Sequence, residues 1–471
     1  MANTSAADRF LALAAEQLDP KVLQPPQPRY LQEPRGIFAG QCAALALPRT
    51  VQEVATLVRL AGQAGLGIVP YGGGTGLVGG QVAPDGPAPL ILSLERMNAI
   101  RSVHPAEDIL IAEAGAILAD VQAAAQDAGR LFPLSLASEG SARIGGTLAT
   151  NAGGTNVLRY GNARDLCLGL EAVLPDGTVW NGLRRLRKDN TGYDLRNLLI
   201  GAEGTLGVIT AAALRLFPRP HGTGTAILTV GSPAQALDLL ALARSQVGEL
   251  ISAFELIHGA GLTFLADTLP DVRQPFDQPP AWCVLIEVGL PMGMDPQDIL
   301  ERLFTEGHAR GLVEDGVIAQ NARQAEAFWA VREHIPEANR LIGAVSSHDI
   351  SVPLAFVPAF ITKASDQIAA LGAYRINCFG HLGDGNLHFN VFAPKGGARA
   401  DFAHHRAAIK GVVHDVVAQF DGSISAEHGI GRLKVADLEH FGDPAKLAAM
   451  RAIKGALDPK GIMNPGAVLR L

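Results

Sequence analysis

The sequence predicts an α+β protein of two or three domains. A chain of 471 residues is too long for one simple core. In its first half, glycine-rich loops follow short apolar runs, and in its middle, runs typical of strands alternate with runs typical of helices. Hydrophobic residues make up 48% of the chain and charged residues 18%. This composition supplies enough apolar surface for packed cores and does not indicate disorder.

The first expected element is a short amphipathic helix within Met1–Leu23. Acidic residues stand among its alanines, and the basic region followed by an apolar run that marks a signal peptide is missing. No stretch of the sequence approaches the roughly 20 apolar residues of a membrane span. We therefore expect a soluble, cytoplasmic protein.

The net charge bears on the class of partner, and the cysteine content bears on disulfides and metal sites. The formal net charge of −7 argues against a nucleic-acid partner. The basic run at residues 184–188 is typical of a solvated loop edge, and a contact for an acidic electron-transfer partner is the alternative. Cys42, Cys167, Cys283 and Cys378 are far apart, so they indicate neither a disulfide framework nor a CxxC metal site.

A glycine-rich loop, Tyr71–Gly80, follows the apolar run Leu66–Pro70. Its glycines match the dinucleotide-binding pattern G-x-G-x-x-G, but three prolines at residues 84–89 forbid the helix that a Rossmann loop must open. The Gly-Lys-Ser/Thr of a P-loop is also missing. We predict a loop between strands whose backbone N–H groups could hold a pyrophosphate.

Two further tracts consist mostly of small residues. They are Ser138–Gly154, rich in hydroxyl and backbone donors, and the shorter Gly201–Ile209, which leads into a strand. Three such tracts in one domain indicate an extended ligand, longer than a mononucleotide.

The middle of the chain predicts a separate α+β domain. Between His221 and about Phe420, strand runs (225–230, 281–288) alternate with helical runs (233–246, 298–307). We expect a sheet covered by helices on one face. Arg219–Gly222, with its proline and glycine, marks the boundary to the first domain.

Residues Gly380–Asn390 predict a β-hairpin that displays polar side chains. Asp384-Gly385 is a dipeptide typical of a two-residue type I′ turn. That register places His381 directly opposite His388, with Cβ atoms roughly 5 Å apart. Because side chains alternate along a strand, Asn390 should share their face and Phe389 the other.

The two imidazoles can reach one cation, and Glu427 in the small-residue stretch Ser425–Gly431 is the best third ligand. A His₂-carboxylate set leaves coordination positions open for water or substrate, as a catalytic site requires. These ligands favour zinc, while manganese, iron or cobalt stay open. The alternative is that both histidines are polar residues on the exposed side of an ordinary hairpin.

Several long motifs resemble a known family. The first half carries Tyr71–Gly80, Ile144–Gly161 and Gly192–Leu195 followed by Gly201–Gly207; the second half carries Gly380–Asn390, Ser425–Gly431 and Asp458–Gly466. The first set resembles the FAD-binding (PCMH-type) domain of the vanillyl-alcohol oxidase flavoproteins, and the second the FAD-linked oxidase C-terminal domain. Together they resemble the FAD-dependent D-2-hydroxyacid dehydrogenases that act on D-2-hydroxyglutarate, D-lactate or glycolate.

The resemblance implies an N-terminal helical segment (1–38), an FAD-binding domain (39–219), a substrate and metal domain (220–420) and a C-terminal segment (421–471) that returns to the FAD domain. It also implies FAD, held non-covalently because Pro70–Gln81 contains no His or Cys. The expected FAD-binding residues are Tyr71, Gly72, Gly73, Gly74, Thr75, Gly76, Leu77, Gly80, Ser138, Ser141, Gly145, Gly146, Thr147, Thr150, Asn151, Ala152, Gly153, Tyr160, Gly161, Glu203, Gly204, Gly207, Val208, Ile209 and Asn464.

In the resemblance, Arg332 corresponds to an arginine that binds a substrate carboxylate. The alternative is a surface ion pair of Arg332 with Glu333 or Asp349. Family members that hold a second substrate carboxylate commonly carry Lys where this chain has Ser347, and Ser or Thr where it has Pro336. D-lactate is therefore as plausible a substrate as D-2-hydroxyglutarate.

The resulting hypothesis is oxidation of a D-2-hydroxyacid, with hydride transfer to flavin N5. His381, His388 and Glu427 would bind the metal, His428 would be the general base, Asn390 would orient the substrate and Arg332 would anchor its carboxylate. Electrons would pass to a quinone, a cytochrome or an electron-transfer flavoprotein, and a homodimer stays open. The alternatives are a non-catalytic flavin-binding subunit of a glycolate oxidase-like complex and a metal-dependent hydrolase.

Overall fold

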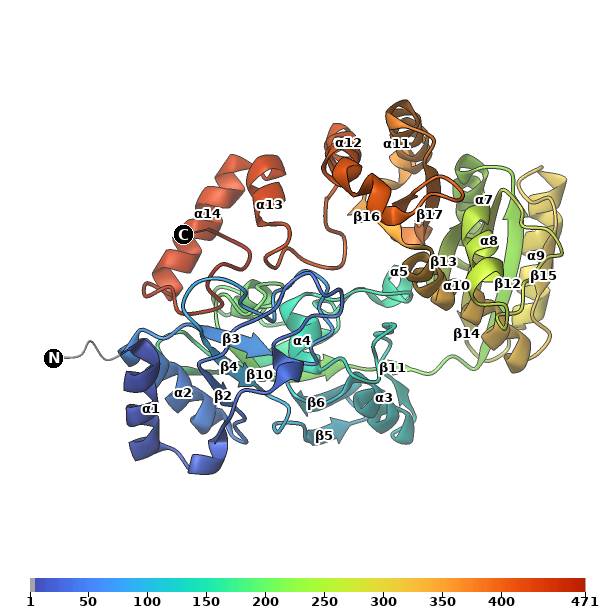
Figure 1. Ribbon diagram of the computed structural model, residues 1–471. Helices are drawn as coiled ribbons and strands as arrows, with labels where there is room; N and C mark the ends of the chain where they lie inside the picture. Colours follow the sequence, from blue (N-terminus) through green and yellow to red (C-terminus); the bar gives the residue numbers. More distant parts are fainter. Residues whose placement is uncertain (1–4, 471) are drawn as a thin grey trace. The chain divides into compact units, whose positions relative to one another are not determined.

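The structure is a computed structural model that describes residues 5–470, and the chain forms two compact units (Figure 1). The first unit contains the chain up to Gly153, Asn162–Arg219, and the chain from His428 onward. The second unit contains Gly154–Gly161 and Pro220–Glu427. The C-terminal segment, red in Figure 1, therefore returns to the first unit.

The first unit is built on two main sheets. One is mostly parallel, in the order β1-β2-β4-β3, and the other is antiparallel, in the order β5-β6-β10-β8-β9. A short pair, β11-β7, accompanies them. The strands are β1 Leu23–Gln24, β2 Ala44–Ala46, β3 Ile68–Tyr71, β4 Leu90–Ser93, β5 Ile100–His104, β6 Ile109–Glu113, β7 Arg130–Leu131, β8 Cys167–Val173, β9 Val179–Gly182, β10 Val208–Arg215 and β11 Phe217–Pro218.

The helices of the first unit begin at recognisable caps. Ser5 and Asp8 form a capping box at the start of α1, which ends at Gln17, and Thr50 caps α2, which ends at Gly65 in the left-handed conformation. The helices are α1 Ala6–Gln17, α2 Val51–Ala64, α3 Leu118–Asp127, α4 Ile144–Ala149, α6 Leu195–Leu199, α13 Val435–Phe441 and α14 Pro444–Leu457. The expected N-terminal helix is thus present over the described residues, and 3₁₀ turns and β1 follow it.

The second unit is built on one seven-stranded antiparallel sheet in the order β15-β12-β14-β13-β17-β18-β16. Its strands are β12 Gly222–Val230, β13 Ile251–His258, β14 Trp282–Leu290, β15 Gly316–Ile318, β16 Ala344–Ser351, β17 Arg375–His381 and β18 Asn386–Phe392. Its helices are α5 Val157–Tyr160, α7 Pro233–Val247, α8 Gly259–Thr268, α9 Pro296–Ala309, α10 Ala322–Ile342, α11 Val357–Leu371 and α12 Arg406–Gln419.

Helices cover both faces of this sheet, so the expectation of helices on one face was wrong. Apolar residues of α7, α9, α11 and α12 pack with one set of strand residues, and those of α8 and α10 pack with the alternate set. In β14, for example, Val284 and Ile286 belong to the first core, and Cys283 and Leu285 belong to the second. Continuous apolar strands are typical of a sheet that is buried on both sides.

The four cysteines are free, and Cys167, Cys283 and Cys378 are buried. The basic run 184–188 carries ion pairs with acidic neighbours: Arg184 with Asp189 and Arg185 with Glu107, each at 3.4 Å. Its positive charge is therefore partly neutralised within the first unit.

Candidate active site

The hairpin of β17 and β18 has a longer turn than the sequence suggested. Leu382–Asp384 form a 3₁₀ turn, and only Gly385, not Asp384, has a positive φ. Phe379, not His381, pairs with His388. The predicted type I′ turn and the predicted His381–His388 register were therefore wrong.

The shift in register is two residues, and an even shift keeps each side chain on its face of the sheet. His381 and His388 thus become diagonal neighbours on one face, with ring centroids 6.0 Å apart. Phe389 packs into the core on the opposite face, as predicted. The histidine pair survives the error because its common face depends on parity, not on the turn type.

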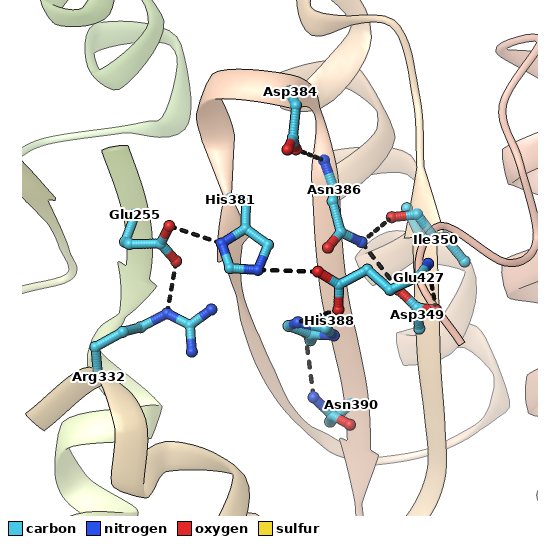
Figure 2. A network of polar contacts seen from close by, with 10 residues as sticks. All are labelled: Glu255, Arg332, Asp349, Ile350, His381, Asp384, Asn386, His388, Asn390 and Glu427. Carbon is cyan, nitrogen blue, oxygen red and sulfur yellow. Dashed lines mark hydrogen bonds and ion pairs between the residues drawn. The ribbon is translucent and has the colours of Figure 1, made fainter. Parts of the chain in front are cut away.

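Glu427 lies beside both imidazoles (Figure 2). One carboxylate oxygen is 3.2 Å from His381 Nε2, and the other is 4.0 Å from His388 Nε2. One ligand atom from each of the three residues can be chosen so that all lie within 4.8 Å of one another. The structure therefore brings together the three residues that the sequence singled out as a metal-binding set.

Glu255, which the sequence analysis missed, is the fully buried partner of His381. It stands on β13 directly opposite His381, and its Oε1 is 2.7 Å from His381 Nδ1. Its second oxygen accepts a hydrogen bond of 2.7 Å from Arg332 Nε. A charged residue inside the apolar stretch 251–257 was the available signal, because a buried acid needs partners.

Asp349 occupies the corresponding place beside His388. It pairs with His388 in the register of β16 and β18, and its Oδ2 accepts a hydrogen bond of 3.0 Å from the backbone N–H of Glu427. Its Oδ1 accepts a hydrogen bond from Asn386 Nδ2. Asp349 thus fixes the backbone of the residue that supplies the carboxylate.

Arg332 is buried in α10, and its ion pair is with Glu255. Glu255 is thus a third residue, different from Glu333 and Asp349, the two partners considered from sequence. Its guanidinium carbon lies 4.8 Å from the centroid of the Phe379 ring. In Figure 2 the terminal nitrogens point away from Glu255, toward the side where His388 and Asn390 lie.

Asn390, which was expected to orient the substrate, is buried on β18, and its Nδ2 donates to the backbone carbonyl of His388 at 3.2 Å. Ser347 pairs with it from β16 and is exposed, and Pro336 is exposed within α10. Proline lacks an N–H and so cannot donate to the carbonyl of Arg332, one turn earlier in the helix.

The electrostatics of the cluster follow from three carboxylates around two imidazoles. Burial disfavours the charged form of His381, but Glu255 and Glu427 outweigh this effect and raise its pKa to about 10. Burial lowers the pKa of His388 to about 4, against the opposing effect of Glu427 and Asp349. Burial alone would raise the pKa of Glu255, yet His381 and Arg332 lower it to about 2.

In the first unit, the small-residue tracts meet around the glycine loop. An added Cβ at Gly72 would lie 3.2 Å from Gly146 Cα, and one at Gly73 would lie 2.2 Å from the carbonyl oxygen of Ser141. A Cβ at Gly204 would lie 2.9 Å from Pro70. Residues 72–89 form no helix and connect the parallel neighbours β3 and β4, as predicted. These close approaches explain why the tracts need glycine.

Two of the expected FAD-binding residues hold these loops together. The buried Glu203 accepts hydrogen bonds of 2.7 Å from the N–H groups of Ile430 and Gly431, and Asn464 Nδ2 donates to the carbonyls of Gly80 and Glu203. Gln81, which the sequence analysis did not single out, donates to the carbonyl of Gly76 at 2.7 Å. The side chains of Glu203 and Asn464 are thus engaged with the protein itself.

The other expected FAD-binding residues fall into both units. Val208 and Ile209 are buried in β10, and Thr147 and Thr150 donate to carbonyls in or near α4. Tyr160 and Gly161 belong to the second unit. Glu427 is the last residue of the second unit, and the proposed base His428 begins the final stretch of the first.

Comparison with known protein families gives two matches. Residues 42–182 match the FAD binding domain, and residues 219–468 match the FAD linked oxidases, C-terminal domain. The chain is 39% identical to the mitochondrial D-2-hydroxyglutarate dehydrogenase of Bos taurus, over 96% of this chain and 80% of that protein. The chain belongs to the FAD-dependent D-2-hydroxyacid dehydrogenase family. The resemblance predicted from the sequence motifs is confirmed.

Other members of this family are similarly close. The mitochondrial D-2-hydroxyglutarate dehydrogenase of Arabidopsis thaliana is 36% identical over 92% of this chain and 76% of that protein. The enzyme of the same name from Xanthomonas citri pv. viticola is 37% identical over 90% of this chain and 88% of that protein. Family membership makes this protein an FAD-dependent oxidoreductase and leaves the hydrolase alternative without support.

Solved structures support the predicted fold class. p-Cresol methylhydroxylase matches with a TM-score of 0.75 at 17% identity, over 98% of this chain and 96% of that one. Alkyldihydroxyacetonephosphate synthase matches with a TM-score of 0.71 at 19% identity, over 97% and 84%. The α+β architecture of the vanillyl-alcohol oxidase type is confirmed. Among residues 5–470, no helix combines the length and apolar character that crossing a bilayer requires.

Proposed function

We propose that this family member oxidises a D-2-hydroxyacid to the 2-oxoacid with the help of a divalent metal, and that D-2-hydroxyglutarate is the first candidate substrate. The observation that carries the proposal is the cluster of His381, His388 and Glu427 in a chain that belongs to an FAD-dependent family. The names of relatives at 36–39% identity support the choice of substrate.

D-lactate is the second candidate, because two residues depart from the pattern of family members that hold a second substrate carboxylate. Family members that hold a second carboxylate carry Lys at the position of Ser347 and Ser or Thr at the position of Pro336. Ser347 has no positive charge, and Pro336 has no hydroxyl group. A D-2-hydroxyacid with one carboxylate would not need a partner at those positions.

The residues present fit a metal. Two imidazole nitrogens and one carboxylate oxygen converge within coordination range, and open positions remain for the substrate. Glu255, Glu427 and Asp349 carry more negative charge than Arg332 offsets, so a divalent cation would balance a buried excess. These ligands favour zinc. When bound, the cation would lower the pKa of the substrate hydroxyl, and FAD would accept the hydride at N5.

The protein side chains then have separate tasks. Arg332 binds the substrate carboxylate with its terminal nitrogens, since Glu255 occupies its Nε. Asn390 orients the substrate from the face of β18 that carries His388. His428 takes the hydroxyl proton as general base.

The flavin is held non-covalently by the three tracts of the first unit. Pro70–Gln81 offers no His or Cys for a covalent bond, and the tracts approach one another through glycines. Backbone N–H groups of such loops can hold a pyrophosphate. The electron acceptor is a quinone, a cytochrome or an electron-transfer flavoprotein.

Anaerobic reduction of the bound flavin by a panel of 2-hydroxyacids tests the proposal. We expect D-2-hydroxyglutarate or D-lactate to bleach the flavin absorbance near 450 nm (about the value for any flavin), and the L-enantiomers to leave it unchanged. A flavin that no D-2-hydroxyacid reduces would point to the non-catalytic subunit. A preparation that binds no flavin would contradict the proposal altogether.

Substitution His428→Ala tests the assignment of the base. Turnover should fall by about 10²- to 10⁴-fold, the usual contribution of a positioned acid or base. FAD and metal content, measured by absorbance and elemental analysis, should stay near the values of the unsubstituted protein. A variant that loses its metal would reassign His428 as a ligand.

A further inference from the structure

We infer that Glu255 is a positioning residue that orients both the metal ligand His381 and the substrate-binding Arg332 through its two carboxylate oxygens. The inference deepens the proposed function and rests on it. Glu255 lies outside the family motifs of the sequence, 126 residues before His381.

The first role of Glu255 is to set the tautomer of His381. A carboxylate at 2.7 Å from Nδ1 accepts the proton on that nitrogen, so the lone pair of the neutral ring lies on Nε2. Nε2 is the atom that faces Glu427, at 3.2 Å. A carboxylate that holds the far nitrogen of a metal-binding histidine fixes the ring orientation and makes the ligand more basic.

The second role of Glu255 is to hold Arg332 in one orientation. Its Nε donates to the other oxygen of Glu255 at 2.7 Å, and its guanidinium lies over the Phe379 ring. These two contacts hold a long side chain in one orientation. The terminal nitrogens, directed away from Glu255 in Figure 2, can then bind a carboxylate end-on without first losing side-chain entropy.

The sheet sets the position of Glu255 itself. It is completely buried on β13, and the register places it opposite His381, the last residue of β17. A buried carboxylate is tolerated only where hydrogen bonds and opposite charge compensate its desolvation. Both oxygens of Glu255 are used in this way, one for each functional group.

Glu287 provides a matched control. It lies on the adjacent strand β14 and is partly buried, and its Oε2 accepts a hydrogen bond of 2.7 Å from Trp329 Nε1. Its carboxylate accepts hydrogen bonds from Trp329 and Thr225, neither of which is a member of the metal-binding cluster. Replacing it with Gln therefore changes a partly buried acid of the neighbouring strand without changing the hydrogen bonds of His381 or Arg332.

The experiment compares Glu255→Gln, Glu287→Gln and Arg332→Gln in the flavin-loaded full chain. Zinc affinity is measured by competition with a chromophoric chelator. KM and kcat are measured at saturating zinc with whichever of D-2-hydroxyglutarate and D-lactate reduces the flavin of the unsubstituted protein. A glutamine has one acceptor oxygen and so cannot serve both partners. We expect Glu255→Gln to weaken zinc binding by about 10- to 100-fold and to raise KM by about 2- to 10-fold.

The two control variants separate the effect of Glu255 on His381 from its effect on Arg332. Glu287→Gln should keep the zinc affinity and the KM of the unsubstituted protein. Arg332→Gln should raise KM and keep the zinc affinity, because Glu255 still holds His381. Should Glu255→Gln fail to fold, Glu255→Asp gives the same readouts, since the shorter side chain cannot reach both groups.

Zinc affinity of Glu255→Gln equal to that of the unsubstituted protein would overturn the inference. An unsubstituted protein that binds no zinc or other divalent cation would instead overturn the metal site of the proposed function. The two failures are therefore distinguishable.

Discussion

At the scale of single residues, burial and charge give the two histidines opposite responses to pH. The pKa of His381 is raised to about 10 and that of His388 is lowered to about 4. A raised pKa stabilises the folded state below the ordinary value of 6.5, and this contribution is lost as the pH rises toward 10. A lowered pKa favours the folded state above 6.5, and this contribution is lost as the pH falls toward 4.

The metal-free protein should therefore lose stability between pH 6.5 and 4.5 partly through His388. Below about pH 5.5, His381 is protonated in both the folded and the unfolded chain and contributes no slope. His388→Asn removes the titrating group and should reduce this pH-dependent loss of unfolding free energy by up to about 3 kcal/mol. Thermal unfolding in a chelator at several pH values measures the effect, and parallel curves for the two proteins would contradict it.

The residues of the cluster also show what a sequence can and cannot predict. His381, His388 and Glu427 could be found because local motifs carry them and because alternation along a strand fixes a face. Glu255 and Asp349 could not be assigned, since their partners depend on which strands are neighbours in the sheet. Strand order is a property of the whole fold, not of a local pattern.

At the scale of elements, the β17–β18 hairpin is the part of the second unit that presents the cluster. Its turn was mispredicted because Leu382–Asp384 form a 3₁₀ turn. A two-residue turn at Asp384-Gly385 would have left Leu382 and Gly383 in the strand. The strands themselves, and those of β12 and β14, were predictable because their apolar runs are long. The helices on the second face could also have been predicted, because a strand buried on both faces reads as a continuous apolar run and one buried on a single face alternates.

Gly380→Ala should disrupt the hairpin. Gly380 has φ of +155°, and an added Cβ would lie 2.4 Å from the carbonyl oxygen of Asn386. We expect a loss of at least about 2 kcal/mol in stability and a loss of bound metal, with FAD retained.

The control for this variant is Gly411→Ala in α12, where an added Cβ meets no atom within 4 Å. It should stabilise the helix by about 0.5–1 kcal/mol. Thermal unfolding and metal analysis distinguish the variants, and metal content in Gly380→Ala equal to that of the control would contradict the account.

The glycine loop of the first unit allows a parallel test. A Cβ at Gly73 would lie 2.2 Å from the carbonyl oxygen of Ser141, whereas one at Gly140 meets nothing within 4 Å. Gly73→Ala should therefore separate the loop from the 138–146 tract and lower the FAD content per chain, and Gly140→Ala should not. Absorbance of the purified proteins measures the ratio of flavin to protein, and equal ratios would show that this close approach is not needed for FAD.

At the scale of the whole molecule, the two proposed kinds of chemistry draw mainly on different units. The glycine tracts up to Gly153 and from Gly201 lie in the first unit, and the three residues of the candidate metal-binding cluster lie in the second. The flavin and the metal should therefore be removable one at a time, since each unit has its own core. Family membership was predictable because several motifs are long and occur in both halves of the chain.

The most direct test of the central claim is the rate of anaerobic flavin reduction after metal removal. The protein is treated with a chelator, metal loss is verified by elemental analysis, and reduction by D-2-hydroxyglutarate and D-lactate is followed by stopped-flow absorbance. We expect the oxidised flavin spectrum to stay unchanged, flavin reduction to slow by at least about 100-fold, and added zinc to restore the rate. Reduction at the original rate in verified metal-free protein would contradict it.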